Sequence, residues 1–190
     1  MTEINRDTKE TQIKCKIDIN GTGTSKIDTG VGFFDHMLEA LSKHSSCDIE
    51  LICNGDLHID AHHTVEDCGI VLGQALKKEI FPIENVERYG NATVVMDEAS
   101  TTCALDLSNR PFLVYKVDLF GKVGEFDVEL SEEFFHALVT NSGLTCHLIN
   151  ERGTNKHHIL EATFKAFAVA LRRALVTNNR LGVPSTKGIL

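Results

Sequence analysis

The strongest constraint on the fold of this chain is a motif that occurs twice, half a chain apart. His62-His63-Thr64-Val65-Glu66-Asp67 is echoed by His157-His158-Ile159-Leu160-Glu161-Ala162, an offset of 95 in a chain of 190 residues. An amphipathic stretch follows each copy. A weaker similarity upstream sets His36 opposite Glu133 at an offset of 97. Repetition of this kind predicts one supersecondary unit used twice, at about 1–85 and 86–190, within a single domain.

Hydrophobic periodicity gives the two halves a similar order of elements. The first half is expected to form strands at 11–19 and 48–53 and helices at 32–41 and 64–80. The second is expected to form strands at 92–96, 101–107, 112–117 and 145–149 and helices at 131–141 and 156–177. Strands and helices alternate without a Gly-rich nucleotide loop. The fold class is therefore α+β, with two half-domains, each a small mixed β-sheet covered on one face by two helices.

Charge and composition exclude several classes of protein. A net charge of −8 argues against a nucleic-acid partner. No apolar run approaches the roughly 20 residues of a membrane span. The six cysteines contain no Cys-x-x-Cys pair, so we expect reduced, buried thiols and a cytoplasmic location rather than a disulfide framework. Residues 151–190, however, hold seven Lys/Arg and two Asp/Glu. This basic segment is either a solvated helix face or a collector of a small anionic group.

The repeated His-His-x-x-Glu motif is suited to metal binding. At about 100° per residue on a helix, Glu66 falls between His62 and His63, and all three share one face. Adjacent imidazoles diverge, so the natural use of such a pair is two metal ions. Imidazole and carboxylate donors without a thiolate favour Mn, Fe, Zn or Ni. A zincin is excluded because it needs His-Glu-x-x-His. A single His-His pair is often only solvated, but two copies at half the chain length argue for a paired metal site.

Six segments then make the sequence recognisable. They are TGVGFFDHML at 29–38, GDLHIDAHHTVED at 55–67, MDEA at 96–99, NRPF at 109–112, HHILEATFKAF at 157–167 and PSTKG at 184–188. In this order they resemble the imidazoleglycerol-phosphate dehydratases of histidine biosynthesis. The resemblance implies a hydro-lyase with the architecture of ribosomal protein S5 domain 2. Its reaction would convert D-erythro-imidazole glycerol phosphate to imidazole acetol phosphate and water.

The resemblance also implies a cofactor and an assembly. The family uses two Mn²⁺ ions per active site and forms a homo-oligomer of 24 subunits, in which neighbouring chains complete each site. By position, one metal would take His36, His63, Glu66 and His158. The other would take His62, His157, Glu161 and Glu133, which stands where the family often has His.

Substrate and catalytic residues are implied in the same way. The positions that match substrate-binding residues of the family are Glu10, His36, His44, His62, His63, Glu66, Arg88, Arg110, His157, His158, Glu161, Lys165, Ser185 and Lys187. Among them, Arg88, Arg110, Lys165, Ser185 and Lys187 would hold the phosphate, because Arg and Lys supply charge-assisted hydrogen bonds. Metal coordination would favour the imidazolate form of the substrate, and a carboxylate would move the protons. Glu161, Glu66 and Glu10 are the candidate catalytic carboxylates.

Two other functions fit some of these features. Paired ions beside basic residues would suit a metallohydrolase that acts on a phosphorylated metabolite. A His-rich, acidic chain could also form a non-catalytic metal-binding shell. His58 and His136 are expected to be plain surface residues, and His147 is as much a structural residue as a ligand.

Overall fold

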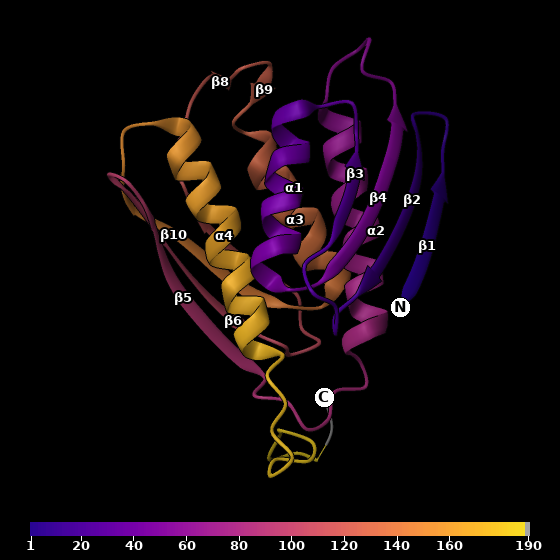
Figure 1. Cartoon of the computed structure of the whole chain (residues 1–190), viewed down its shortest axis with the longest axis vertical. Helices are drawn as coiled ribbons and strands as arrows, with labels where there is room; N and C mark the ends of the chain where they lie inside the picture. The colour runs from indigo at the N-terminus through magenta and orange to yellow at the C-terminus, as the bar shows by residue number, and fades with distance from the viewer. Residues whose placement is uncertain (189–190) are drawn as a thin grey trace.

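The computed structural model describes residues 1–188 and places two four-stranded β-sheets on the outside of four helices (Figure 1). The first half contains β1 (Thr2–Asp7), β2 (Thr11–Asp18), β3 (Ser25–Asp28), α1 (Gly32–Ser45), β4 (Asp48–Gly55) and α2 (His62–Ile80). The second half contains β5 (Tyr89–Met96), β6 (Ala99–Asp106), β7 (Phe112–Lys116), β8 (Lys122–Val123), β9 (Phe126–Asp127), α3 (Leu130–Ser142), β10 (Thr145–Arg152) and α4 (Lys156–Ala174).

The two halves have the same topology. The first sheet has the strand order β1-β2-β4-β3 and the second has β5-β6-β10-β7. In both sheets the first three strands in this order pair antiparallel and the last pair is parallel. Each half therefore forms a mixed four-stranded sheet with two helices on one face, as the repeat predicts. The hairpin β8-β9 is an insertion in the second half alone.

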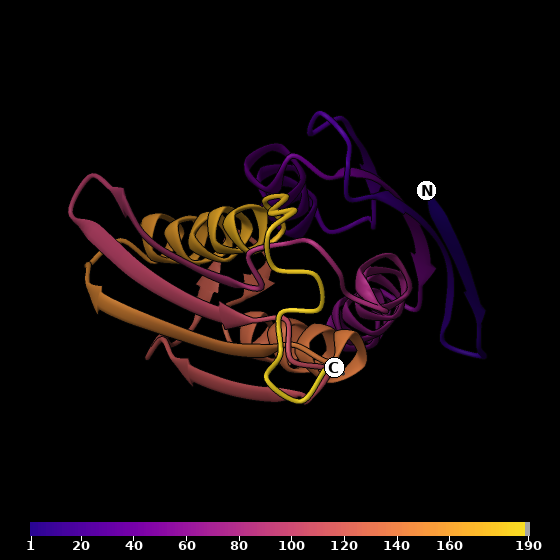
Figure 2. The same ribbon diagram turned by 90° about the horizontal axis from the view of Figure 1, so that it is seen from below.

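The helices form the middle of the molecule, where the two halves meet. Helix α1 packs against α4, and α2 packs against α3, as the view from below also shows (Figure 2). The α2–α3 contact is close because Gly69 and Gly73 face the backbone of α3. A Cβ added at Gly73 would lie 2.6 Å from the Leu138 carbonyl oxygen. Six phenylalanines are fully buried in the core: Phe34, Phe126, Phe134, Phe135, Phe164 and Phe167.

Several boundaries differ from the sequence-based expectation. Helix α2 begins at His62 rather than residue 64, and α4 ends at Ala174 rather than 177. Helix α1 continues to Ser45, so His44 lies on it. The edge strands β1 and β3 were not expected, because β1 reads as polar and β3 has only four residues. Paired neighbours, rather than their own hydrophobic pattern, make these segments strands.

The cysteines agree with the expectation of buried thiols. All six cysteines are buried and free of disulfide bonds. Burial raises the pKa of Cys15 to about 12 and that of Cys47 to about 11, so both stay protonated thiols. Within residues 1–188, no helix is both long enough and apolar enough to cross a membrane.

Candidate metal centre and phosphate pocket

The second His-His-x-x-Glu motif lies at the very start of α4. The side chain of Asn155 caps this helix by accepting hydrogen bonds from the backbone N–H groups of His157 and His158. The helix therefore begins at the motif and holds both imidazoles in its first turn. Glu161 follows one turn later on the same face, where its side chain is only 8% exposed.

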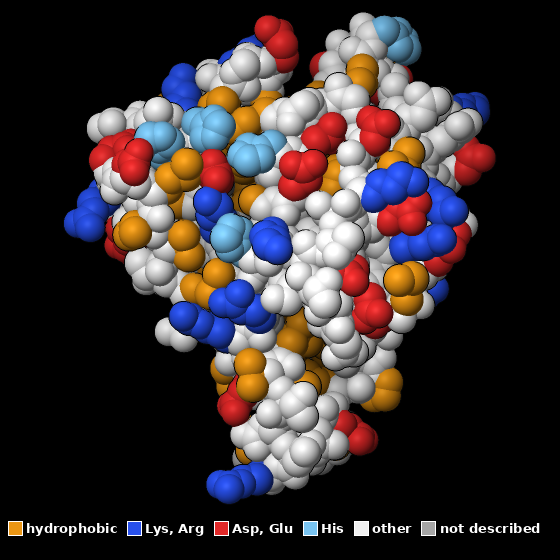
Figure 3. Space-filling model, viewed as in Figure 1, with side chains coloured by type: hydrophobic (Ala, Val, Ile, Leu, Met, Phe, Trp, Pro, Cys, Tyr) orange, Lys and Arg blue, Asp and Glu red, His pale blue; other side chains and the backbone are white. Residues whose placement is uncertain are grey.

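His36 of α1 joins this motif from the other half of the chain. The Glu161 Oε2 atom lies 3.0 Å from His157 Nε2 and 3.6 Å from His36 Nε2. One donor atom each of His36, His157 and Glu161 lies within 4.8 Å of the others, the one group of three such donors among residues 1–188. Two imidazoles and a carboxylate are a suitable donor set for a divalent first-row metal. Figure 3 shows the histidine side chains gathered above α4 and α1.

Lys165 holds the other oxygen of Glu161. Its Nζ lies 2.7 Å from Glu161 Oε1, one turn further along α4. Burial alone would raise the pKa of Glu161, but the hydrogen bonds from Lys165 and His157 outweigh it and lower the pKa below the ordinary value. The carboxylate is therefore kept ionised, the state in which it binds a cation.

The first copy of the motif has the same local geometry at the start of α2. His62 Nε2 lies 3.7 Å from Glu66 Oε2, which matches the His157–Glu161 pair of α4. His63 lies against two carboxylates, with Nδ1 2.9 Å from Asp56 Oδ2 and Nε2 3.8 Å from Glu10 Oε1. The adjacent rings are nearly perpendicular in both copies, at 87° for His62–His63 and 83° for His157–His158. The pairs therefore diverge as expected.

Two carboxylates in these clusters were not among the predicted site residues. Asp56 Oδ2 lies 2.9 Å from Nδ1 of His63, and Glu98 Oε2 lies 2.8 Å from Nδ1 of His158. These hydrogen bonds are the main reason that the pKa of each histidine is raised. Asp56 and Glu98 both stand in the segments that carry the family resemblance; Asp56 is seven residues before His63, whereas Glu98 is 60 residues before His158. Only the fold brings them together.

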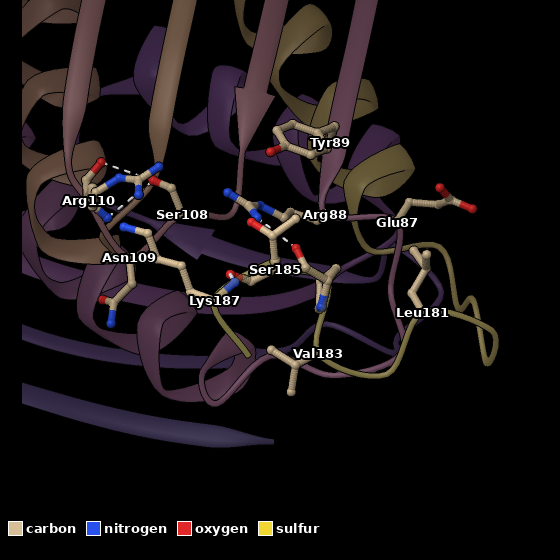
Figure 4. Close-up of a pocket in the computed structure, with 12 residues that line it drawn as sticks. Glu87, Arg88, Tyr89, Ser108, Asn109, Arg110, Leu181, Val183, Ser185 and Lys187 are labelled. Carbon is tan, nitrogen blue, oxygen red and sulfur yellow. Dashed lines mark hydrogen bonds between the residues drawn. The ribbon is translucent and has the colours of Figure 1, made fainter. Parts of the chain in front are cut away.

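A second site lies at the opposite end of the molecule, where the C-terminal segment folds back under the sheets. It is a pocket of about 850 Å³. Four residues expected to bind phosphate line it, namely Arg88, Arg110, Ser185 and Lys187. Figure 4 shows Lys187 and Ser185 between Arg110 on one side and Arg88 on the other. The structure therefore brings four of the five predicted phosphate-binding residues to one pocket, and phosphate binding by them stays a prediction.

The four residues are not equivalent. Arg88 is buried and its guanidinium is already engaged, because Nε and Nη2 donate to the two oxygens of Asp106 at 2.7 and 3.1 Å. Its Nη1 donates to the Pro184 carbonyl at 2.7 Å and so ties the C-terminal segment to β6. Asp106 raises the pKa of Arg88 further. Arg110 is 67% exposed and lies 3.9 Å from Asp106, so its guanidinium is open to a ligand.

The remaining predicted residues lie apart from these groups. Lys165 is not in the lining of the pocket but beside Glu161, and His44 lies near Lys165 and Arg172. Burial and these two cations lower the pKa of His44. Glu133 is exposed in the first turn of α3 and is outside the group of His36, His157 and Glu161. His58 and His136 are exposed, as expected, and His147 lies exposed on β10 beside the Phe112 ring.

Comparison with known proteins agrees with these motifs. A sequence model of the imidazoleglycerol-phosphate dehydratase family matches residues 29–171, well over half of the chain. This chain belongs to the imidazoleglycerol-phosphate dehydratase family. It is 78% identical to the imidazoleglycerol-phosphate dehydratase of Aliarcobacter butzleri and 64% identical to that of Sulfurovum sp., with all 190 residues covered in both. The enzyme is thus a hydro-lyase of histidine biosynthesis.

Solved structures of the family have the same fold. The imidazoleglycerol-phosphate dehydratase of Staphylococcus aureus is 39% identical and superposes with a TM-score of 0.83 over 94% of this chain and 100% of its own. The Pyrococcus furiosus enzyme, in complex with (S)-C348, is 36% identical with a TM-score of 0.85 over 98% of this chain and 100% of its own. The duplicated α+β architecture is therefore that of the dehydratase family.

Proposed function

We propose that this family member is a manganese-dependent dehydratase that converts D-erythro-imidazole glycerol phosphate to imidazole acetol phosphate and water. The observation that carries the proposal is the convergence of His36, His157 and Glu161, from the two halves of the chain, on one group of metal-type donors. A substrate of this kind has an imidazole at one end and a phosphate at the other. The donor cluster and the cationic pocket provide one site for each, but they lie at opposite ends of one chain, so the two sites that hold one substrate would come from neighbouring subunits.

Two Mn²⁺ ions per active site are the cofactor we propose. His36, His63, Glu66 and His158 would hold one ion, and His62, His157, Glu161 and Glu133 the other, although within one chain His36 lies beside two members of the second set, His157 and Glu161. When bound, the metal would supply Lewis acidity that makes the imidazole of the substrate a better electron reservoir. The donor chemistry supports this choice, because every proposed ligand is an imidazole or a carboxylate and none is a thiolate.

The protein's own carboxylates would move the protons. Dehydration removes a proton from carbon and expels a hydroxyl, which needs a group that first accepts and then donates a proton. Glu161 can accept a proton because it is ionised at neutral pH, although Lys165 and His157 lower its pKa and so make it a weaker base. Glu66 and Glu10 are the other candidates, and Glu10, 55% exposed, can exchange protons with water.

Arg110, Lys187 and Ser185 would bind the phosphate directly. Arg110 and Lys187 are exposed cations of the pocket and Ser185 is a neutral donor. Arg88 would contribute mainly by holding Pro184, and hence the neighbouring Ser185, in place. Lys165 and His44, which lie near α4 and α1 rather than in the pocket, would contact the substrate closer to the metals.

A homo-oligomer of 24 subunits with shared sites is the assembly we propose. Two observations support an oligomer. The eight proposed ligands do not all meet within residues 1–188 of one chain, because α2 and α4 present separate clusters. The second sheet also leaves Tyr89, Val95 and Phe112 more than 60% exposed, whereas the first sheet exposes mutually paired charges such as Lys26 and Glu50. A second copy of the chain would cover the apolar sheet.

The proposed location is the cytoplasm. Six buried thiols without disulfide bonds suit a reducing compartment. Histidine biosynthesis is also a pathway of small soluble intermediates, which suits the same location.

The product of the reaction distinguishes the three candidate functions. Metal-loaded, assembled protein is incubated with imidazole glycerol phosphate, and both imidazole acetol phosphate and inorganic phosphate are measured. Dehydration predicts the first product without the second. Release of inorganic phosphate would identify a metallohydrolase, and a lack of turnover would identify a metal-binding shell. If neighbouring chains share metals, a chelator should also reduce the sedimentation coefficient, and an unchanged profile would contradict shared sites.

A further inference from the structure

In each copy of the motif, the second histidine has a carboxylate within hydrogen-bond distance of its Nδ1 atom. His63 Nδ1 lies 2.9 Å from Asp56 Oδ2, and His158 Nδ1 lies 2.8 Å from Glu98 Oε2. An ionised carboxylate can only accept a hydrogen bond, so the ring must donate from Nδ1. A neutral imidazole with its proton on Nδ1 has a lone pair on Nε2, the nitrogen then free for a metal.

The other two histidines of the repeated motif have a different arrangement. His62 and His157 approach carboxylates through Nε2, at 3.7 Å from Glu66 and 3.0 Å from Glu161. Those carboxylates are themselves proposed ligands. In both copies of the motif, the second histidine therefore contacts a carboxylate outside the motif, and the first histidine contacts the glutamate of the motif itself.

The surrounding fold holds Glu98 through its carboxylate and Asp56 through its backbone, while the Asp56 Oδ1 atom is buried without a hydrogen-bond partner. Glu98 Oε1 accepts hydrogen bonds from the backbone N–H groups of Thr154 and Asn155, in the loop that leads into α4. Asp56 follows β4, its side chain is only 12% exposed, and its backbone N–H donates to the Glu10 carbonyl at 3.0 Å. The two are unrelated in local sequence, yet each holds the second histidine of its motif. Because two carboxylates from different parts of the fold make the same contact with Nδ1, we attribute the contact to a role in the site rather than to chance.

We infer that Asp56 and Glu98 are positioning residues that fix the Nδ1–H tautomer and the ring orientation of His63 and His158 for metal binding. This inference rests on the proposed function, in which both histidines belong to the same metal. Carboxylates behind a ligand histidine raise its basicity and orient the ring, and their removal typically costs about 10- to 100-fold in metal affinity. The two Mn²⁺ positions should then differ, and the one that takes His63 and His158 should be the tighter.

Equilibrium titration of metal-free protein with Mn²⁺ tests this inference, with free Mn²⁺ followed by electron paramagnetic resonance. The wild type should bind two ions per site, one more tightly. Asp56→Ala should weaken that tighter ion by roughly 10- to 100-fold and leave the other within about twofold. Asp56→Asn, whose amide oxygen still accepts from Nδ1–H, should recover part of the affinity. Glu98→Ala should act on the same ion.

Glu84→Gln is the control. Glu84 is an exposed carboxylate that follows the C-terminal end of α2, whereas His63 lies at the N-terminal end of that helix. It should leave both affinities within about twofold. Wild-type affinity in Asp56→Ala and Glu98→Ala would overturn the inference, as would equal weakening of both ions, which indicates a general loss of structure. A wild type that binds no Mn²⁺ stoichiometrically would instead refute the proposed metal site.

Discussion

Lys165 Nζ and Glu161 Oε1 lie 2.7 Å apart on successive turns of α4, at a position where the carboxylate is almost fully buried. The opposite oxygen of Glu161 faces His36 and His157. One side of this carboxylate therefore contacts an ammonium group and the other contacts two imidazoles. Glu161 would therefore already carry its negative charge when a metal binds on the side of the two histidines.

Replacement of Lys165 should change the pH dependence of stability. Lys165 helps to lower the pKa of Glu161 below its ordinary value of 4.5, so the stabilising effect is complete above that value and is lost as the pH falls through the lowered pKa. Lys165→Met should therefore be less stable than the wild type near pH 7, and the difference should shrink as the pH falls below about 4. Lys165→Arg, which keeps the cation, should stay closer to the wild type.

Urea unfolding of metal-free protein over this pH range, at one protein concentration, is the measurement. A difference between Lys165→Met and wild type that is the same at both ends of the range would show that the pair does not depend on the charge of Glu161.

Loss of a phosphate contact should raise KM. Arg110 is exposed at the edge of the 850 Å³ pocket and its guanidinium is largely free. A charge-assisted hydrogen bond contributes about 1.5–3 kcal/mol, so Arg110→Ala should raise KM by roughly 10- to 100-fold. Because the group is remote from the reacting carbon, kcat should change little. Steady-state kinetics measure both constants, with Lys122→Ala as an exposed-cation control outside the pocket. A fall in kcat at unchanged KM would contradict phosphate binding by Arg110.

Removal of Asp106 should destabilise the protein. Arg88 is 9% exposed and donates to both oxygens of Asp106, so Asp106→Ala leaves a buried cation without its partner. Such a loss costs about 3–5 kcal/mol when the pair is buried. The free energy of unfolding should fall by about 3 kcal/mol. Arg110→Ala, which removes only the exposed neighbour of Asp106, should change it by less than about 1 kcal/mol. Similar effects of the two substitutions would show that the Arg88–Asp106 pair is not a structural support.

A methyl group at the α2–α3 contact should also destabilise the protein. Alanine is the better helix former by about 1 kcal/mol, but a Cβ at position 73 would lie 2.6 Å from the Leu138 carbonyl oxygen. Gly73→Ala should therefore lower the unfolding free energy by about 1–3 kcal/mol. Gly32→Ala is the control, because no atom lies within 4 Å of its added Cβ. Thermal and urea unfolding of both variants give the comparison, and a Gly73→Ala variant more stable than the wild type would contradict such a close contact.

The long amphipathic elements were predictable because their own residues determine them. Helices α2 and α4 have buried apolar positions at helical spacing, and β2 and β4 alternate, so the periodicity identifies them. Strands β1 and β3 are edge strands whose pairing is decided by β2 and β4, and no local pattern signals them. The start of α2 at His62 was also missed, since Ala61 at the N-cap position provides no side-chain cap.

The candidate site was predictable to a similar extent. The repeated motif identifies His62, His63, Glu66, His157, His158 and Glu161, because their spacing within one helix is local. The convergence of His36 on Glu161 depends on the packing of α1 against α4, and the contacts of Asp56 and Glu98 depend on loops. Those tertiary relationships leave no trace in a single sequence. Only the internal repeat and the family resemblance indicate that Glu133 is a metal ligand, and this assignment stays a prediction.

Metal dependence of turnover tests the central claim most directly. Metal-free protein is titrated with Mn²⁺ while the formation of imidazole acetol phosphate is measured at saturating substrate. The account predicts no turnover without metal, a rise that levels off near two ions per site, and no comparable rise in Glu161→Gln. Full turnover by the metal-free protein, or wild-type turnover by metal-loaded Glu161→Gln, would contradict it.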